Sequence, residues 1–248
     1  MKLFQYWDAP EPPAYVAEWI ETFRAGNPGL EHRLYDRGSA AWFIGKHIGE
    51  RERRAFEACA VPAMQADYFR LCALKRYGGL YFDADMRCLA PLDALVEQAP
   101  HGFVPLLHGR LINNAMLMRQ AEDPFIDACL RLCTSNIEAR DIPNVFTATG
   151  PGVLWAIQAL VRPELAEGLL AAMDNMLQAG WLFPRVVERA RAEISVTEAL
   201  VQSFNGLTLL PKAVLHRWIG RTNPPYQQTE IHWLNWRGSI YASPLDPA

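Results

Sequence analysis

The stretch ADYFRLCALKRYGGLYFDAD, residues 66–85, constrains the fold more than any other, because it combines the signals of a helix, a stop and a strand. Between Pro62 and Tyr77 apolar residues recur at a roughly helical spacing, and proline suits a first helical turn, where its missing N–H costs little. Gly78 and Gly79 then end the predicted helix, since glycine adopts the left-handed backbone without steric cost. The apolar run at 80–82 that follows has strand composition.

The predicted strand runs into two carboxylates, Asp83 and Asp85. Two carboxylates at the C-terminal end of a buried strand are costly unless something compensates their charge, and a divalent cation that carries phosphates is the usual compensation. Asp67 and Arg70 lie one turn apart on the preceding helix. A metal and diphosphate site is the leading hypothesis. The alternative is an exposed turn with solvated aspartates and a surface Asp67–Arg70 ion pair.

Composition limits the size and the partners of the chain. With 248 residues, 50% hydrophobic and 21% charged, the chain is long enough for one large core, and we expect a single domain over residues 1–248. The net charge of −3 and the pI near 6.1 lack the basic excess that nucleic acid requires. We therefore expect no nucleic-acid partner.

The cysteines and the N-terminal segment favour a cytoplasmic protein. The five cysteines are an odd number without the spacing of a metal site, which suits a reducing compartment. Asp8 and three prolines interrupt the N-terminal segment where a secretory signal needs an unbroken apolar core. No apolar run is long enough to span a membrane. Any membrane contact that is compatible with this sequence is therefore peripheral.

The N-terminal part predicts an alternation of strands and helices, typical of an α/β fold. The expected elements are a strand at 2–7, a helix at 14–25 and a second strand at 32–35. Because ligands of open α/β sheets bind beyond the C-terminal strand ends, Gln5 to Asp8 would line a nucleotide pocket. Trp7 would lie close to the base or pack in the core.

The rest of the chain continues this alternation. The expected elements are a helical segment at 38–60, a strand pair at 103–107 and 112–118, helices at 122–137 and 153–160, and a helical insertion at about 162–202. Asn113 and Asn114 lie in an otherwise apolar strand. Their amides need hydrogen-bond partners there, which sugar hydroxyls or the backbone would supply.

The pattern A-D-x-x-R-x-x-x-L-x-x-x-G-G-x-Y-x-D-x-D occurs at Ala66, Asp67, Arg70, Leu74, Gly78, Gly79, Tyr81, Asp83 and Asp85. It resembles the DXD sugar-binding region of a glycosyltransferase family that includes initiating α-mannosyltransferases, capsular polysaccharide transferases and, more distantly, the large clostridial glucosylating toxins. The resemblance implies a GT-A fold, with a Rossmann-like mixed sheet flanked by helices. It also implies a UDP- or GDP-linked sugar donor, Mn²⁺ or Mg²⁺, a saccharide, lipid-linked saccharide or other hydroxyl acceptor, and retention of anomeric configuration.

The same resemblance implies roles for individual residues. Asp85 would bind the metal directly, and Asp83 would act through water or on the ribose. Asp67 would hydrogen-bond hydroxyls of the donor, and Arg70 would contact the sugar or the Asp pair. No nucleophilic carboxylate is evident, so the acceptor is expected to attack from the front face with help from the leaving phosphate. The residues predicted to bind the donor are Gln5, Trp7, Tyr81, Asn114, Trp236 and Ser239.

The C-terminal stretch TEIHWLNWRGSIY, residues 229–241, resembles the segment with which relatives close over the metal and diphosphate. His232, Trp236, Gly238 and Ser239 match that segment, whereas Ile240 replaces the usual tryptophan. His232 would be a third metal ligand or a diphosphate ligand; the alternative is a histidine that faces solvent or hydrogen-bonds within the core. A chain that ends at residue 229 would then keep its fold and lose transfer. The alternative is that the tryptophans of this segment are fixed core, in which case the truncation would lower the melting temperature sharply.

Two other functional classes compete with this hypothesis. A haloacid-dehalogenase-type phosphohydrolase also places D-x-D after an apolar strand, but that strand is normally the first, and the acidic pair that it needs far downstream does not occur here. A non-catalytic nucleotide-sugar-binding protein on the same fold is compatible with the sequence. Turnover of the donor would distinguish it from an enzyme.

Overall fold

The computed structural model of the protein describes residues 1–165, 168, 183–221, 232 and 235–242. Its strands are β1 (Lys2–Tyr6), β2 (Glu31–Tyr35), β3 (Gly79–Phe82), β4 (Met86–Cys88), β5 (Gly102–Leu107), β6 (Arg110–Leu111), β7 (Ala115–Met118), β8 (Thr208–Pro211) and β9 (Ile219–Arg221). Its helices are α1 (Ala14–Gly26), α2 (Arg37–His47), α3 (Glu50–Glu57), α4 (Pro62–Tyr77), α5 (Asp93–Glu97), α6 (Pro124–Ala139), α7 (Val145–Ala148), α8 (Pro151–Val161), α10 (Phe183–Glu193), α11 (Glu198–Gly206) and α12 (Lys212–Leu215), with a 3₁₀ turn η1 at Pro163–Leu165.

The main sheet is mixed, as predicted. Its strand order is β2-β1-β3-β7-β5-β6, and β8 also pairs with β5. Strand β1 runs parallel to both β2 and β3, whereas β7 is antiparallel to β3 and to β5. Because β1 and β3 are parallel neighbours, their C-terminal ends meet at one edge of the sheet. Strands β4 and β9 form a separate two-stranded sheet.

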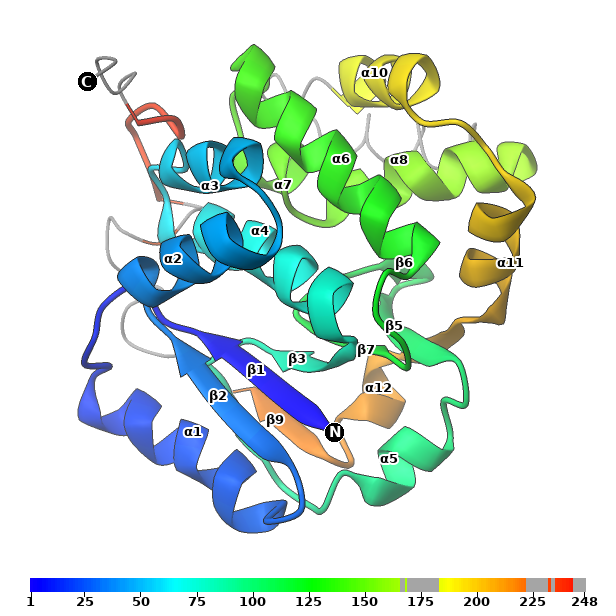
Figure 1. Ribbon diagram of the computed structural model, residues 1–248. Helices are drawn as coiled ribbons and strands as arrows, with labels where there is room; N and C mark the ends of the chain where they lie inside the picture. The colour runs from blue at the N-terminus through cyan, green and yellow to red at the C-terminus, as the bar shows by residue number, and fades with distance from the viewer. Residues whose placement is uncertain (166–167, 169–182, 222–231, 233–234, 243–248) are drawn as a thin grey trace.

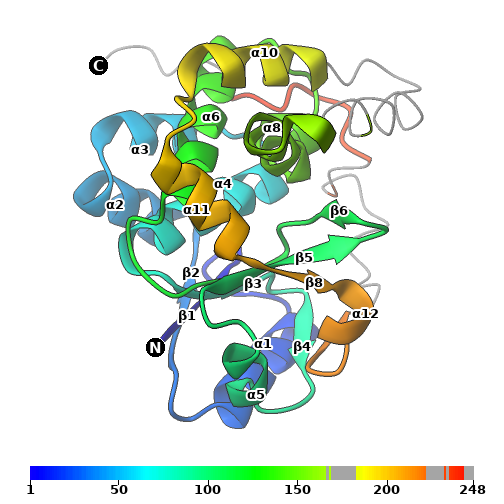
Figure 2. The same cartoon turned by 90° about the vertical axis from the view of Figure 1, so that its right-hand side faces the viewer.

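Helices cover both faces of the sheet, so the fold has three layers (Figure 1). Alternate residues of β1 and β3 point to opposite faces. Leu3 and Leu80 pack toward α1 and α5, whereas Phe4 and Tyr81 belong to the larger core beneath α2, α4 and α6. Figure 2 shows these two helical layers from the side, with α1 and α5 on one side of the sheet and α2, α3, α4 and α6 on the other.

Helix α4 and strand β3 confirm the prediction for residues 62–82. Pro62 occupies the first turn of α4, and Gly78 caps its C-terminal end with φ of +62°. Gly79 has φ of +89°, and a Cβ atom there would lie 2.5 Å from the carbonyl oxygen of Lys2. Only glycine therefore allows the chain to leave α4 and enter β3 directly beside β1.

Two predicted elements differ in the structure. The helical segment at 38–60 is two helices, α2 and α3, because the chain turns at Gly49. The strand predicted at 112–118 is shorter in the structure, where β7 begins only at Ala115 and residues 112–114 connect it to β6. The carbonyl of Asn113 accepts from Arg70, and that of Asn114 accepts from the amide of Asp83. The predicted helical insertion at 162–202 contains η1, α10 and the first part of α11. Residues 166–167 and 169–182 lie outside the described residues.

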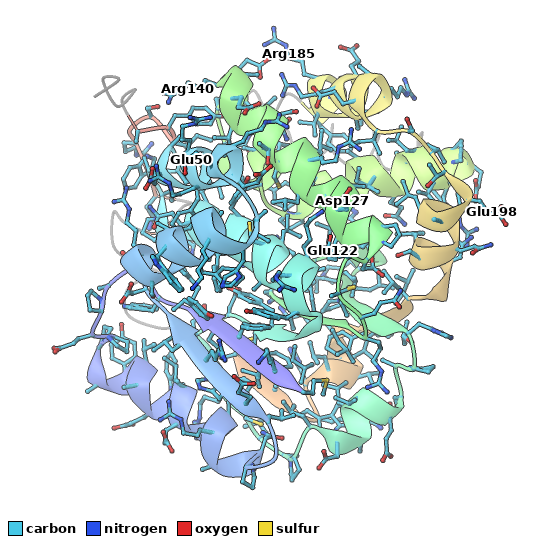
Figure 3. The ribbon with its side chains drawn as sticks, viewed as in Figure 1. Glu50, Glu122, Asp127, Arg140, Arg185 and Glu198 are labelled. Carbon is cyan, nitrogen blue, oxygen red and sulfur yellow. The ribbon has the colours of Figure 1, made fainter. Side chains whose placement is uncertain are left out.

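The surface and the thiols follow the pattern expected from composition. Charged side chains such as Glu50, Arg185 and Glu198 lie on the outside of the helices (Figure 3). All five cysteines are free, and four of them, including Cys129 and Cys133 on α6, are buried. Within the described part of the chain, no helix is long and apolar enough to cross a membrane.

Candidate functional site

A pocket of about 420 Å³ lies beyond the C-terminal ends of β1 and β3. Its walls come from the end of β1, the first turns of α4, the Asp83–Asp85 turn, the loop before β7 and the α7–α8 region. Residues far apart in the sequence are thus brought to the edge of the sheet where ligands of α/β folds bind. The predicted site residues in its lining are Trp7, Asp67, Arg70, Tyr81, Asp83, Asp85, Asn114 and His232.

A buried ionic network forms the floor of the pocket. The guanidinium of Arg70 lies 3.0 Å from Asp67 Oδ1 and donates to Asp83 Oδ1 at 2.8 Å. The Arg70 and Asp67 side chains are only 3% and 10% exposed. The alternative of a surface Asp67–Arg70 pair is therefore wrong. Helix α4 places both residues on the side that faces β3, where the Arg70 guanidinium lies 4.6 Å from the centre of the Tyr81 ring.

Asp67 receives further hydrogen bonds from two other segments. The side-chain amide of Asn113 donates to its Oδ1 at 2.9 Å, and the hydroxyl of Thr149 donates to its Oδ2 at 3.3 Å. These bonds join α4 to the loop before β7 and to the end of α7. The carboxylate is therefore a fixed acceptor in the wall of the pocket.

Burial and the neighbouring charges act in opposite directions on these groups. Desolvation raises the pKa of Asp67, while Arg70, Asn113 and Thr149 oppose that rise. Burial on its own lowers the pKa of Arg70, but Asp83, Tyr81 and Asp67 together hold it above its ordinary value. The guanidinium thus stays charged and is shared between two carboxylates.

The predicted acidic pair lies in a tight turn between β3 and β4. The amide of Met86 donates to the carbonyl of Asp83 at 3.2 Å, which closes a four-residue turn with Asp85 at its third position. Asp85 is only 3% exposed although it lines the pocket. The alternative of an exposed turn with solvated aspartates is therefore wrong.

The described side chains that line the pocket carry a net negative charge. Among the described lining residues, the carboxylates of Asp8, Asp67, Asp83 and Asp85 outnumber the cationic side chains of Arg70 and Lys212. The N-terminal ends of α4 and α8 also line the pocket, and neither has a side-chain cap. Their amides carry partial positive charge, which favours an anionic ligand group.

The donor set fits a hard divalent cation. Asp83 and Asp85 offer carboxylate oxygens, which Mg²⁺ and Mn²⁺ prefer, at the edge of a pocket whose side chains are net negative. In the ranges that the structure describes, no three His, Cys, Asp or Glu side chains form a ready-made metal site. Two carboxylates together with substrate phosphates are a common way to hold Mg²⁺. His232 lines the same pocket, and its role as a third ligand stays a prediction.

Three predicted donor-binding residues are not in the pocket lining. Gln5 is completely buried in β1, where its side chain contacts the backbone of Asp83 and the ring of His32. The Trp236 indole N–H donates to the carbonyl of Ser239 at 3.0 Å, and the Ser239 hydroxyl accepts from the amide of Tyr241. Trp236 packs against the larger core. Gln5 therefore supports the acidic turn from behind, whereas Trp236 and Ser239 bond within the C-terminal segment and not to the described wall of the pocket.

The C-terminal segment is anchored more firmly than a simple closing flap. Ile240 and Tyr241 are buried, and residues 240 and 242 exchange backbone hydrogen bonds with Ala58 and Ala60, just before α4. The Tyr241 hydroxyl donates to the carbonyl of Ile142 at 2.8 Å. A chain ending at residue 229 would lose these core contacts, which argues against the prediction that it keeps its fold; measuring the stability of the shortened chain tests that prediction. Trp233 lies outside the described residues.

Several lining residues carry no sequence signal that identifies them in advance. Lys212 begins α12, more than a hundred residues after the acidic pair, and Phe146 lies on the four-residue helix α7. Pro62, Ala63 and Ala66 line the pocket because they form the first turns of α4. A lysine after a proline or a phenylalanine in a short helix is too common to predict a site.

Comparisons with known proteins find a family model and a solved structure that this chain resembles. Residues 13–101 match a family model described as "Glycosyltransferase sugar-binding region containing DXD motif". A solved structure titled "PaToxG Glycosyltransferase" is similar to this chain with 17% sequence identity and a TM-score of 0.46, over 83% of each chain. No curated protein matches the sequence. The matched region contains Asp67, Arg70, Asp83 and Asp85.

Proposed function

We propose that this chain is a glycosyltransferase of GT-A type that transfers a sugar from a UDP- or GDP-linked donor to a saccharide, lipid-linked saccharide or other hydroxyl acceptor. The proposed transfer depends on Mn²⁺ or Mg²⁺ and retains anomeric configuration. The observation that carries the proposal is the Asp83–Asp85 turn, which faces a pocket at the edge where β1 and β3 end. The match of residues 13–101 to the DXD sugar-binding region supports it.

Charge explains why such a site calls for a cation. A diphosphate entering a pocket with more carboxylates than cationic side chains would be repelled. Asp83 and Asp85 would hold the divalent ion, and the N-terminal ends of α4 and α8 would add partial positive charge. When bound, the ion supplies Lewis-acid stabilisation of the diphosphate leaving group.

The buried network gives the other residues their proposed roles. Asp67, fixed by Arg70, Asn113 and Thr149, presents acceptor oxygens for donor hydroxyls. Arg70 keeps the Asp83 carboxylate oriented, because its own position is set by two ion pairs and by the carbonyl of Asn113. The Asn114 side-chain oxygen is buried without a hydrogen-bond partner in the described part of the chain, which suits contact with a polar ligand.

A thermal-shift panel followed by a turnover assay tests the proposal. UDP- and GDP-linked sugars are added with Mn²⁺ or with EDTA, and we expect one donor class to raise the Tm only with the metal. With that donor, nucleotide release should require metal, and NMR of the product should show a retained anomer. Metal-dependent binding without turnover would instead identify a non-catalytic nucleotide-sugar-binding protein. Stabilisation by no nucleotide would contradict both functions.

A further inference from the structure

A buried glutamine connects the two parallel strands β1 and β2 to the acidic turn. Gln5 lies near the C-terminal end of β1 and has no solvent exposure. Its Nε2 donates to the backbone carbonyl of Asp83 at 3.3 Å, and its Oε1 lies 2.8 Å from Nε2 of His32 on β2. The side chain therefore crosses from the neighbouring strand to the first residue of the Asp83–Met86 turn.

Only one orientation of the Gln5 amide satisfies both neighbours. The Asp83 carbonyl can only accept, so the amide nitrogen must face it. The amide oxygen then faces His32, whose Nε2 must carry a proton to donate. Burial, with a contribution from Arg24, lowers the pKa of His32 to about 4, so the ring is neutral at pH 7 with its proton on Nε2. The two hydrogen bonds that link His32, Gln5 and Asp83 thus have one donor-to-acceptor direction, from the His32 ring to Gln5 and from Gln5 to the Asp83 carbonyl.

The acidic turn depends on such outside support. Its central residues are Ala84 and Asp85, and neither is the proline or glycine that would favour one turn type by itself. The amide of Asp83 donates to Asn114 at 2.9 Å, and its carbonyl accepts from both Met86 and Gln5. Gln5 thus supplies a bond from the β1 side, and the carbonyl of Asn114, just before β7, supplies one from the other side.

We infer that Gln5 is a positioning residue that holds the Asp83–Met86 turn in the conformation in which Asp83 and Asp85 bind a divalent cation. This inference rests on the proposed function, since it assigns Gln5 to the metal site of that function. Gln5 does not line the pocket and makes no contact with substrate in this role. Residues that orient the ligands of a metal commonly change its affinity by about 10–100-fold when they are replaced.

Matched glutamine variants test this role. Gln65 is also buried; its amide donates to the carbonyl of Cys59 at 2.8 Å and accepts from the Tyr6 hydroxyl at 2.7 Å. Gln5→Met and Gln65→Met each remove a buried amide with two hydrogen bonds, but only Gln5→Met removes a hydrogen bond from the Asp83 carbonyl. Mn²⁺ binding is measured by electron paramagnetic resonance with UDP and with GDP, together with amide exchange at Met86.

We expect Gln5→Met to bind Mn²⁺ at least about tenfold more weakly and to exchange the Met86 amide faster, while Gln65→Met remains within about twofold of the wild type. Wild-type Mn²⁺ affinity in folded Gln5→Met would overturn the inference, as would an equal loss in Gln65→Met. If Gln5→Met does not fold, Gln5→Glu keeps the volume and the acceptor for His32 but, when ionised, has no donor for Asp83. If the wild type binds no Mn²⁺ with either nucleotide, the proposed function fails. The role of Gln5 in holding the turn is tested separately, and an unchanged exchange rate of the Met86 amide in Gln5→Met would reject it.

Discussion

At the scale of single residues, burial changes what Asp67 and Arg70 are expected to do. A surface pair contributes at most about 1 kcal/mol, whereas breaking a buried pair leaves an uncompensated charge and costs several times more. Here the two side chains share hydrogen bonds with Asn113, Thr149 and Asp83. Helical spacing in the sequence indicated that the pair exists. It did not indicate that the pair is buried, because Asn113 and Thr149, which pack over Asp67, are distant from it in the sequence.

Asp67→Asn should therefore lower both activity and stability. We expect the free energy of unfolding to fall by about 3 kcal/mol. Among the described residues Arg70 then keeps Asp83 alone as an ionic partner, and an asparagine cannot accept all the hydrogen bonds that the carboxylate accepts. The exposed pair Arg51–Glu138 provides the control, and Glu138→Gln should cost less than about 1 kcal/mol. Urea unfolding measures both variants. Equal and small losses in the two variants would show that the Asp67–Arg70 pair behaves as a surface pair.

The low pKa of His32 predicts a specific dependence of stability on pH. Burial lowers the pKa of His32 to about 4 in the folded state, below its ordinary value of 6.5, so the folded protein binds fewer protons than the unfolded chain between these two pH values. The contribution of His32 is therefore fully present above pH 6.5 and is lost as the pH falls toward 4. His32→Gln retains a donor for Gln5 and does not titrate.

The measurement is the urea midpoint of the wild type and His32→Gln from pH 7 to pH 4. We expect the wild type to lose more stability than the variant in that window. Only the wild type has His32, whose buried ring is neutral in the folded protein and must compete with protonation in the unfolded chain. Parallel pH profiles for the two proteins would contradict the buried, neutral state of His32.

At the scale of elements, the link between α4 and β3 is the part that the sequence predicts best. The helical spacing, the proline and the glycine pair are local signals, and the structure has the predicted boundaries. The late start of β7 within the strand predicted at 112–118 was not predictable in this way. The carbonyl of Asn113 accepts from Arg70, a residue distant in sequence, and local composition does not reveal such a contact.

Gly79 gives a direct test of this link. Gly79→Ala places a Cβ atom 2.5 Å from the Lys2 carbonyl at a φ of +89°, and we expect a loss of about 2 kcal/mol or more in the free energy of unfolding. Gly29→Ala is the control, because a Cβ atom there meets nothing within 4 Å. Thermal unfolding compares the two variants, and a Gly79→Ala protein as stable as Gly29→Ala would refute the required backbone geometry.

At the scale of the whole molecule, the pocket combines parts of the chain that the sequence does not connect. The carboxylates could be predicted because they follow a recognisable helix and strand. Lys212 and Phe146 could not, since only the folding of α7 and α12 around the sheet edge brings them there. Gln5 was predicted to bind the donor, whereas the structure buries it outside the pocket lining and in contact with the acidic turn, which only the folded chain reveals.

The C-terminal anchor makes a further whole-molecule prediction. A chain that ends at residue 229 loses the buried side chains of Ile240 and Tyr241, and we expect its free energy of unfolding to drop by roughly 3 kcal/mol or more. A chain that ends at residue 242 retains them and should match the full chain. Thermal unfolding of the two shortened chains decides this point; equal melting temperatures would restore the view of a tail that only closes over the ligand.

The central claim is that Asp83 and Asp85 bind a nucleoside diphosphate through a divalent cation. Isothermal titration calorimetry with the nucleoside diphosphate of the best donor, in Mn²⁺ and in EDTA, tests it most directly. For the wild type we expect Mn²⁺ to strengthen binding by at least about tenfold, or 1.4 kcal/mol, and for folded Asp85→Asn we expect Mn²⁺ to have no effect. Wild-type affinity in Asp85→Asn that also persists in EDTA would contradict the assignment.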